Sequence, residues 1–391
     1  MSRRFTWRVL APVALGATLV TSCGSSSSSK SGSTGASGTT AVSVDAGDTS
    51  CQVSTEQLPA GRHTFAVKNT GSNMTEVYVY APGDRVVGEV ENIGPSTSRS
   101  LVVDLPAGGY EVACKPGMTG HGIRFALAVA ATAGDAASST AASPSADPAL
   151  TQAVSRYRAY LRTETDALIT DTAAFTAAVA RGDVTAAKQL YPAARQHYER
   201  IEPVAESFGD LDPLIDERAA DVAPGTSLVG FHRLERDLWA GKLDAASTQA
   251  GTGLLAHCRT LAARVATLPV TPLTMGNGAK SLLDEVAKTK VTGEEEHYSH
   301  IDLVDFAANV AGSREVVEAL RPVLSHRDPA LLATLDTRFA SLQKLLDSHR
   351  DPAVPGGYQS YQQLAPAQVR ALAVAVDAVS EPLGRLAGVL T

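Results

Sequence analysis

The 391-residue sequence has little cysteine, no basic excess and no long apolar run. It contains 4 cysteines, and its 34 basic side chains face 41 acidic ones, for a formal net charge of −7. Without a basic stripe the chain lacks the electrostatic footprint of nucleic-acid binding, which excludes that class of partner. An acidic surface attracts cations rather than phosphates. The N-terminal apolar run, Val9 to Val20, is too short to span a bilayer.

That short run belongs to an export signal. Three arginines precede it, and Thr21-Ser22-Cys23 closes it, as in a bacterial lipoprotein signal. We therefore predict that residues 1–23 comprise the signal peptide and a lipidated Cys23. The protein is expected in the cell envelope, either lipid-anchored to the outer face of the cytoplasmic membrane or periplasmic.

Two low-complexity stretches divide the rest of the chain. Residues 24–41 are rich in Ser and Gly, and residues 131–148 are rich in Ala and Ser. Neither has an apolar pattern that could offset its chain entropy, so both are predicted to be flexible linkers. They delimit two predicted domains, 42–130 and 149–391.

The first domain has the pattern of an all-β sandwich. Short segments such as HTFAVKN, EVYVYA and SLVVDL alternate with a period of two and are separated by turns containing Gly, Pro and Asn. Their β-branched and aromatic content is typical of half-buried strands.

Two interpretations of its cysteines remain open. The segment Cys114-Lys-Pro-Gly-Met118 could present thiolate and thioether to copper, although the paired histidines of a blue-copper site lack the expected spacing. Alternatively, a Cys51–Cys114 disulfide pins the first strand to the penultimate one, and Met118 only packs. Cys258, in the second domain, is interpreted as a buried free thiol.

The second domain is predicted to be an all-α bundle, because apolar residues recur at three- and four-residue steps. Glu164 lies on an otherwise apolar stripe, where it needs a cation or a hydrogen-bond network unless the register lets it reach solvent. Glu199 and Glu202 flank the apolar row of a helix predicted from Val184 to Phe208 and are candidate ligands. The alternative is that they belong to a solvated charged face of this helix. The acids of the next segment are interpreted as helix caps: Asp210, Asp212 and Asp216.

The most informative motif is GFHRLE, residues 230–235. His232 and Glu235 stand three positions apart in a predicted helix, so an imidazole and a carboxylate share one face, as metal ligands do. A plain His–Glu pair on a helix surface is the alternative. The sequence has no HExxH, and Arg236 stands where an inverted zinc motif has its second His.

A second block, TGEEEHYSHIDLVDF at residues 292–306, crowds further ligands together. A capped helix start explains the same block, so both interpretations stay open. Its potential oxygen and imidazole ligands are Glu294, Glu295, Glu296, His297, His300, Asp302 and Asp305.

In combination, these motifs resemble a known family. The string from Asp84 to Pro95 together with Cys114–Met118 is similar to the cupredoxin-like domain of EfeO-type iron-uptake proteins. RQHYERIEP, GFHRLE and GEEEHYSHIDLVDF resemble the imelysin-like domain of the same family. The resemblance implies a cupredoxin-like domain at 42–130 and an imelysin-like domain at 149–391.

The resemblance also implies two metal sites. One lies at His232 and Glu235, with Glu164, Glu199 or Glu202 as helpers, and iron is the implied metal. The other lies in the sandwich and holds copper or a second iron. Its implied residues are Cys51, Glu76, Glu89, Cys114 and Met118.

The implied function is that of an extracytoplasmic iron-binding component without catalytic turnover. It would deliver iron to an Ftr-type iron permease, alongside a dye-decolourising haem peroxidase of the same system. Two alternatives remain. One is an HxxE metallopeptidase, since imelysin-related proteins have been classed that way. The other is ferroxidase or electron-transfer work by the sandwich, which needs a redox metal at Cys51, Cys114 and Met118.

Overall fold

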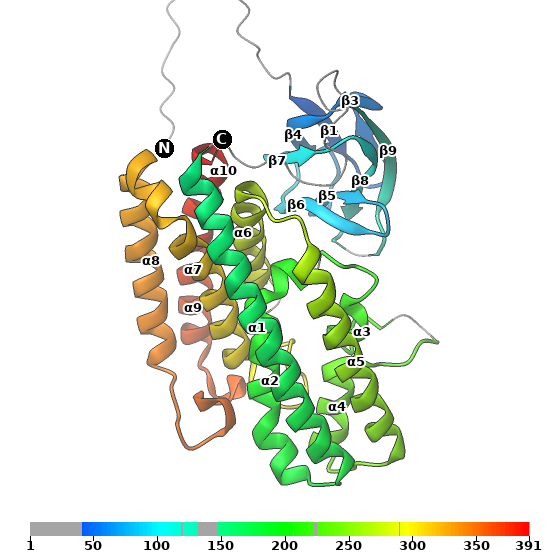
Figure 1. Cartoon of the computed structure of the whole chain (residues 1–391), viewed down its shortest axis with the longest axis vertical. Helices are drawn as coiled ribbons and strands as arrows, with labels where there is room; N and C mark the ends of the chain where they lie inside the picture. The colour runs from blue at the N-terminus through cyan, green and yellow to red at the C-terminus, as the bar shows by residue number, and fades with distance from the viewer. Residues whose placement is uncertain are drawn as a thin grey trace, which may run out of the picture. The chain divides into compact units, whose positions relative to one another are not determined.

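The structure, a computed structural model, combines a β-sandwich and a helical bundle in one chain (Figure 1). It describes residues 41–118, 120–131, 147–205, 207–222, 225–288 and 290–390. Strands occupy residues 42–130 and helices residues 148–389, which confirms the predicted fold class. The predicted signal peptide, Cys23 and nearly all of both predicted linkers lie outside the described residues.

The sandwich consists of two sheets. Their strand orders are β2-β1-β4-β7 and β3-β9-β8-β5-β6. In β1 the side chains of Val42, Val44 and Ala46 are buried and the two between them are exposed, the period of two that one buried face requires. The strands are β1 (Val42–Ala46), β2 (Cys51–Val53), β3 (Gln57–Pro59), β4 (Gly61–Asn69), β5 (Thr75–Ala81), β6 (Arg85–Ile93), β7 (Ser98–Leu105), β8 (Gly108–Pro116) and β9 (Ile123–Ala130).

A disulfide joins the two sheets. Cys51 in β2 and Cys114 in β8 are covalently bonded, with their Cα atoms 5.5 Å apart. The disulfide interpretation is therefore confirmed. The assignment of Cys51 and Cys114 as metal ligands is wrong, because the bond consumes both thiolates. Cys258 is free and buried, as predicted, and burial raises the pKa of its thiol to about 12.

The helical part contains ten α-helices and three 3-10 turns within the described residues. Helix α1 packs along α2 and α5, and α7 packs against α2, α6 and α8. The elements are α1 (Pro148–Ala180), α2 (Val184–Ala205), α3 (Asp212–Asp216), α4 (Gly230–Trp239), α5 (Ala245–Thr267), α6 (Pro272–Lys288), η1 (Lys290–Thr292), α7 (Asp302–Arg327), α8 (Pro329–Asp347), η2 (Pro355–Gly357), η3 (Tyr361–Gln363), α9 (Pro366–Leu383) and α10 (Leu386–Val389).

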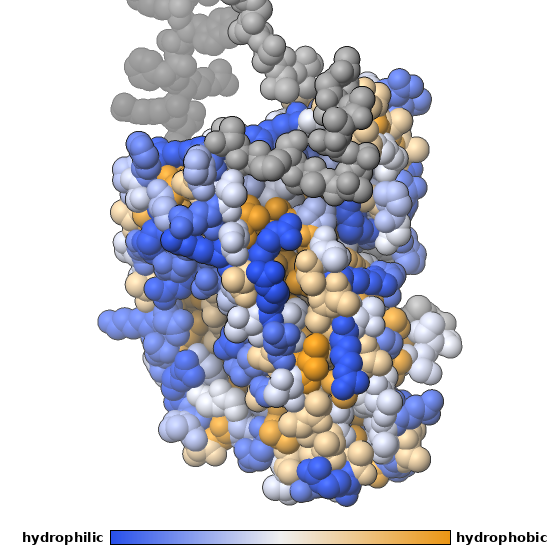
Figure 2. Space-filling model, in the orientation of Figure 1, coloured by the Kyte–Doolittle hydropathy of each residue, from blue (hydrophilic) through white to orange (hydrophobic). Residues whose placement is uncertain are grey.

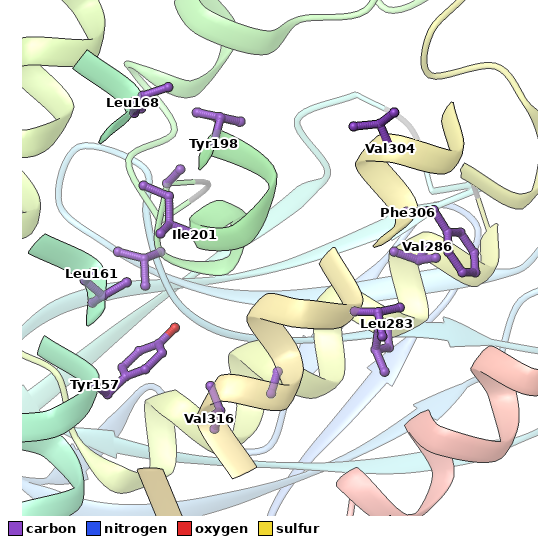
Figure 3. Packing of buried hydrophobic residues seen from close by; sticks show 14 of the residues in the cluster. Tyr157, Leu161, Leu168, Tyr198, Ile201, Leu283, Val286, Val304, Phe306 and Val316 are labelled. Carbon is purple, nitrogen blue, oxygen red and sulfur yellow. The ribbon is translucent and has the colours of Figure 1, made fainter. Parts of the chain in front are cut away.

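The apolar stripes of four helices meet in the core of the bundle, as Figure 3 shows. Tyr157, Leu161 and Leu168 of α1 recur at the spacing of one helix face, and each is at most 3 % exposed. They pack with the buried side chains of α2, α6 and α7, among them Tyr198, Ile201, Leu283, Val286, Val304, Phe306 and Val316. The core thus fixes the faces that α2 and α7 turn inward.

The visible surface of the bundle carries no continuous apolar band. In Figure 2 hydrophobic residues form small groups, and hydrophilic residues separate them. Among the described residues, four large hydrophobic side chains are exposed: Met74, Leu214, Val354 and Val374. In the same part of the chain, no helix combines the length and the apolarity that crossing a membrane requires.

Removal of the disulfide should destabilise the protein by about 3–4 kcal/mol, because the bond closes a loop with a sequence separation of 63 residues. A variant with Cys51→Ala and Cys114→Ala should unfold at lower temperature in scanning calorimetry than the parent chain. Cys258→Ala, which removes a thiol without opening a loop, is the control. Equal losses in both variants would contradict a role for the bond.

Candidate metal centre

Two glycines allow the close approach of chain segments that builds the candidate site. Gly230 begins α4 with a φ of +69°, and a Cβ there would overlap the carbonyl oxygen of Ile215 in α3. A Cβ on Gly312 of α7 would overlap the carbonyl oxygen of Arg200 in α2. Only glycine fits both positions. The first contact brings α4 against α3, and the second brings α7 against α2.

Helix α4 places the HxxE pair in the interior. His232 is 1 % exposed and Glu235 is fully buried, so the alternative of a surface pair is wrong. His232 Nδ1 lies 3.1 Å from Glu235 Oε2. The other carboxylate oxygen, Oε1, accepts the backbone N–H groups of Tyr298 and Ser299 at 2.8 and 2.7 Å. Glu235 thereby fixes the turn before α7 as well as the imidazole.

The remaining nitrogen of His232 faces two more carboxylates. Its Nε2 lies 3.5 Å from Oδ1 of Asp216, the last residue of α3, and 3.7 Å from Oε1 of Glu295. Ligand atoms of these three residues all lie within 4.8 Å of one another, and His232, Glu235 and Glu296 form a second such trio. Imidazole and carboxylates from different segments therefore converge on one place, as in metal sites of helical bundles.

Nε2 of His232 is buried and has no close hydrogen-bond partner in the described chain, since the two carboxylate oxygens lie 3.5 and 3.7 Å away. The carboxylates themselves are paired: Oδ1 of Asp216 with Nη1 of Arg195, and Oε2 of Glu295 with Nη1 of Arg218, 3.6 Å away. Buried polar atoms are normally satisfied, because an unpaired one loses its hydration without compensation. Nε2 of His232 is the atom that a cation between these side chains would engage.

Arg195 is the central cation of the cluster. It projects from α2, is fully buried, and forms ion pairs with carboxylates from three other segments besides its own helix. Their charges raise its pKa far above the ordinary value, although burial alone would lower it. The five carboxylates belong to Glu199, Asp216, Glu295, Glu296 and Asp305.

Lys290 is a second buried cation. Its Nζ donates to Glu199 Oε2 at 2.5 Å and to both carboxylate oxygens of Glu202, at 2.8 and 2.7 Å. The Asn309 amide of α7 also donates to Glu199 and Glu202, at 2.9 and 2.6 Å. Burial and the charge of Glu199 raise the pKa of Glu202 well above its usual range, whereas Arg195 and Lys290 hold the pKa of Glu199 below it.

The cluster holds more carboxyl groups than cations. Eight carboxyl side chains, none more than 7 % exposed, face three permanent cations, Arg195, Lys290 and the partly exposed Arg218. The eight are Glu199, Glu202, Asp216, Glu235, Glu295, Glu296, Asp302 and Asp305.

Burial and crowding keep part of this excess protonated. Burial raises the pKa of Asp305 to about 7 and that of Asp302 to about 6. Burial and the charge of Glu235 raise the pKa of Glu296 well above its usual range. Burial alone would lower the pKa of His232, but its contacts with Glu235 and Glu295 raise it. The cluster therefore holds protons that an added cation would displace.

Comparison with known proteins identifies the family. The imelysin family model matches residues 153–386, and the model of the cupredoxin-like domain matches residues 13–123. Iron uptake system component EfeO from Escherichia coli (strain K12), Shigella flexneri and Shigella boydii serotype 4 is 38 % identical to the chain over 352 residues, which cover 89 % of this chain and 91 % of each relative. The chain belongs to the EfeO family.

Four of the five helical residues predicted for the EfeO-type site lie in the buried cluster: His232, Glu235, Glu199 and Glu202. The fifth, Glu164, lies elsewhere. Its Oε2 is 2.7 Å from His197 Nδ1 and 3.3 Å from Arg200 Nη1, and the cluster's trios do not include it. The carboxylate of Glu164 is thus compensated by a cation and a hydrogen bond, as its position on an apolar stripe requires, and its side chain is only 13 % exposed.

The sequence-based predictions missed other residues of the cluster or left their roles open. Asp216 was interpreted as a helix cap and instead faces His232. In the block 292–306, four of the seven candidate ligands are buried in the cluster, and Glu294, His297 and His300 are not. The run of three glutamates at residues 294–296 was a usable signal for the carboxylates of the cluster. The i, i+4 spacing of Arg195 and Glu199 marked that pair, but nothing in the local pattern marked Lys290 or the contacts of Arg195 with distant segments.

The residues predicted for the sandwich site do not form a comparable cluster. The three trios of metal-capable side chains found in the described chain all belong to the helical part. Glu76 is buried with Oε1 3.5 Å from Lys115 Nζ, and burial together with Glu76 raises the pKa of Glu89 to about 7. Met118 is half-buried in the turn after β8.

The metal-free EfeO-type cluster should make the protein less stable as the pH rises from about 5 to about 7.5. Glu202, Glu296, Asp302, Asp305 and His232 all have raised pKa values, so across this window the folded state binds more protons than the unfolded state. Their contribution to the free energy of unfolding is complete below the pKa values of the unfolded state. It is lost as the pH rises through the pKa values of the folded state.

Thermal unfolding of chelator-treated protein across this range measures the effect. Asp302→Asn, which cannot ionise, should flatten the decline in part, whereas Asp336→Asn, on the exposed face of α8, should leave it unchanged. A melting temperature that is constant or rises over the window would contradict the protonated cluster.

Proposed function

We propose that this chain is the extracytoplasmic iron-binding component of an uptake system. It captures iron at the buried cluster around His232 and Glu235 and delivers it to a membrane permease. One observation carries the proposal: a buried cluster contains an excess of carboxyl groups, and one ligand atom from each of Asp216, His232 and Glu295 lies within 4.8 Å of the other two.

The donor set supports iron as the cargo. Carboxylate oxygens suit a hard ion, and imidazole is an accepted ligand of iron. Asp216, His232 and Glu295 would supply one set of ligand atoms, and Glu235 and Glu296 lie on the other side of the imidazole. The relatives in Escherichia coli and Shigella are named as components of an iron uptake system. Zinc would accept part of this set, but the predominance of oxygen donors favours the harder cation.

The geometry supports binding rather than turnover. A metallopeptidase needs an open metal position and a general base whose pKa lies near the working pH. Glu235 does not meet this need. Its oxygens are engaged by two backbone N–H groups and by His232, and these partners lower its pKa although burial would raise it. We therefore propose a carrier and not a peptidase, despite the peptidase label of the imelysin family model.

The sandwich receives a more limited role in the proposal. Copper or electron-transfer chemistry depended on thiolates at Cys51 and Cys114, which the disulfide removes. Glu76 and Glu89 remain and favour a hard cation over copper. The proposed setting is the cell envelope, with a lipid at Cys23 as the membrane tether. The proposed partners are an Ftr-type iron permease and a dye-decolourising haem peroxidase.

Loss of the HxxE pair should abolish tight iron binding. Chelator-treated protein with His232→Ala and Glu235→Ala, titrated calorimetrically with ferric citrate, should bind more weakly by at least about 100-fold, since loss of a single outer-shell partner already costs ~10–100-fold. The matched control replaces the other hydrogen-bonded His–Glu pair, with His197→Ala and Glu164→Gln.

The control should bind iron as the parent does, because its pair lies outside the cluster. Unchanged affinity in the His232 and Glu235 variant would refute the assignment of the site. Weakened binding in the control instead would show that Glu164 serves the metal, as first predicted from the sequence.

A further inference from the structure

The turn before α7, residues 293–300, forms one wall of the buried cluster and contains neither helix nor strand. Its two faces differ. Glu295 and Glu296 are buried in the cluster. Glu294 and His297 are exposed. The same short stretch of backbone therefore faces the candidate ligands on one side and water on the other, and we call it the strap.

The candidate centre is closed to solvent. His232 is 1 % exposed, Glu235 is fully buried, and the side chain of Asp216 is 7 % exposed. A cation cannot reach Nε2 of His232 through a fixed wall, so loading requires part of the wall to move. The surrounding helices are held by apolar stripes in the core, but no residue of the strap belongs to that core. Segments with few buried apolar contacts open at the lowest cost, which singles out the strap.

Both ends of the strap have left-handed backbone. Gly293 has a φ of +74° and His300 a φ of +58°, which residues other than glycine rarely adopt. Both ends also rest on Tyr361 of η3. Its ring packs where a Cβ on Gly293 would lie, and its backbone N–H donates to the carbonyl oxygen of His300 at 2.9 Å. Its hydroxyl donates to the carbonyl oxygen of Val291, just before the strap. The ends are thus fixed at two positions of unusual backbone conformation, as at hinges.

Between these ends, Glu235 of α4 holds the strap. Its Oε1 accepts the backbone N–H groups of Tyr298 and Ser299 at 2.8 and 2.7 Å. Its Oε2 lies 3.1 Å from His232 Nδ1. One carboxylate therefore joins the backbone of the strap to the imidazole that is proposed to bind the cation. Outward movement of the strap must release these two N–H groups.

A bound cation would add a second connection between α4 and the strap. Nε2 of His232 on α4 and Oε1 of Glu295 on the strap lie 3.7 Å apart. The inward carboxylates of the strap are also held from α2, since Arg195 Nη2 lies 3.3 Å from Glu295 Oε1 and Arg195 Nε lies 3.1 Å from Glu296 Oε1. A cation that bridged His232 and Glu295 would fasten the strap to α4 at a ligand as well as at Glu235. Loading would therefore hold the strap shut.

We propose that residues 293–300 act as a hinged strap that opens to admit the cation and closes over it. The two left-handed residues are the pivots, and Glu235 is the latch. Opening withdraws Glu295 and Glu296 together with the wall, so one movement both admits water and removes ligands, and it serves uptake and release alike. The inference rests on the proposed function and specifies how a buried centre is loaded and emptied.

The first test weakens the latch without replacing a candidate ligand. Ser299→Pro removes one of the two N–H groups that Glu235 accepts. Ser299→Ala, which also loses the hydroxyl but keeps the N–H group, is the matched control. In the full mature protein, uptake of terbium(III), a hard luminescent cation, is followed by stopped-flow luminescence, and its release is started with excess EDTA.

Uptake and release should both be at least about 10-fold faster in Ser299→Pro than in Ser299→Ala, because a hydrogen bond to a charged group is lost. The affinity, which is the ratio of the two rates, should change much less. A strap that only supplies ligands would change the affinity and not both rates. Equal rates in the two variants would overturn the latch.

Tyr361→Phe tests an end of the strap and covers the case in which Ser299→Pro does not fold. It keeps the ring against Gly293 and removes the hydroxyl that donates to Val291, so uptake and release should again be faster than in the parent. Tyr110→Phe, which removes a hydroxyl that donates to Pro106 in the sandwich, is its control and should match the parent. Parental rates in Tyr361→Phe would contradict the role of the hinge.

Hydrogen exchange of the parent measures the movement directly. In chelator-treated protein the amides of Tyr298 and Ser299 should exchange faster than those in the middle of α4 and α7. Terbium at concentrations far above its Kd should slow them at least about 10-fold, because the cation binds the closed state. Exchange as slow as that of α7 before loading would overturn the strap.

The outcomes for the strap and for the site can be separated. If tight cation binding survives His232→Ala with Glu235→Ala, the proposed function fails, whatever the rates show. If binding is lost in that variant but Ser299→Pro and Ser299→Ala take up and release terbium at equal rates, only the strap fails.

Discussion

Eight carboxyl groups are held away from water by a cluster that supplies only three permanent cations, and this imbalance governs the helical part of the protein. An ionised carboxylate buried without a partner costs several kcal/mol, so each of these groups must find a cation, a donor or a proton. Arg195, Lys290 and the backbone N–H groups of Tyr298 and Ser299 meet part of that need. Raised pKa values at Asp302, Asp305 and Glu296 meet another part, and the proposed bound cation would meet the rest.

The cluster also determines which chain segments must come together. Its members come from α2, α3, α4, η1, the turn before α7 and α7 itself, and no single segment satisfies its own charges. Gly230 and Gly312 permit two close backbone approaches, α3 with α4 and α2 with α7. Binding of a cation, as proposed, would therefore stabilise contacts among all these segments at once and couple cation loading to the stability of the bundle.

The sequence predicted the parts whose signal is local and missed those that depend on distant contacts. Strand and helix periodicity defined both folds, and the three-residue spacing of His232 and Glu235 correctly placed them on one face. The spacing of Cys51 and Cys114 fits a disulfide and a soft metal site equally well, and only their three-dimensional proximity distinguishes the two. Glu164 shows the limit of periodicity, since it lies on the apolar stripe of α1 and yet its carboxylate contacts His197 instead of the cluster.

Charge balance also bears on which cation the cluster suits. Under the proposed function, each positive charge that enters would replace a proton held on a carboxyl group whose pKa burial has raised, so a trivalent ion would release more of these protons than a divalent one. Coulomb attraction in a buried site grows with the charge of the ion, whereas Arg195 and Lys290 repel every cation from fixed positions. A site with fewer surplus carboxylates would leave that repulsion uncompensated. The surplus at Glu295, Glu296 and Asp305, next to Arg195, would thus allow a highly charged cation to bind beside a buried guanidinium.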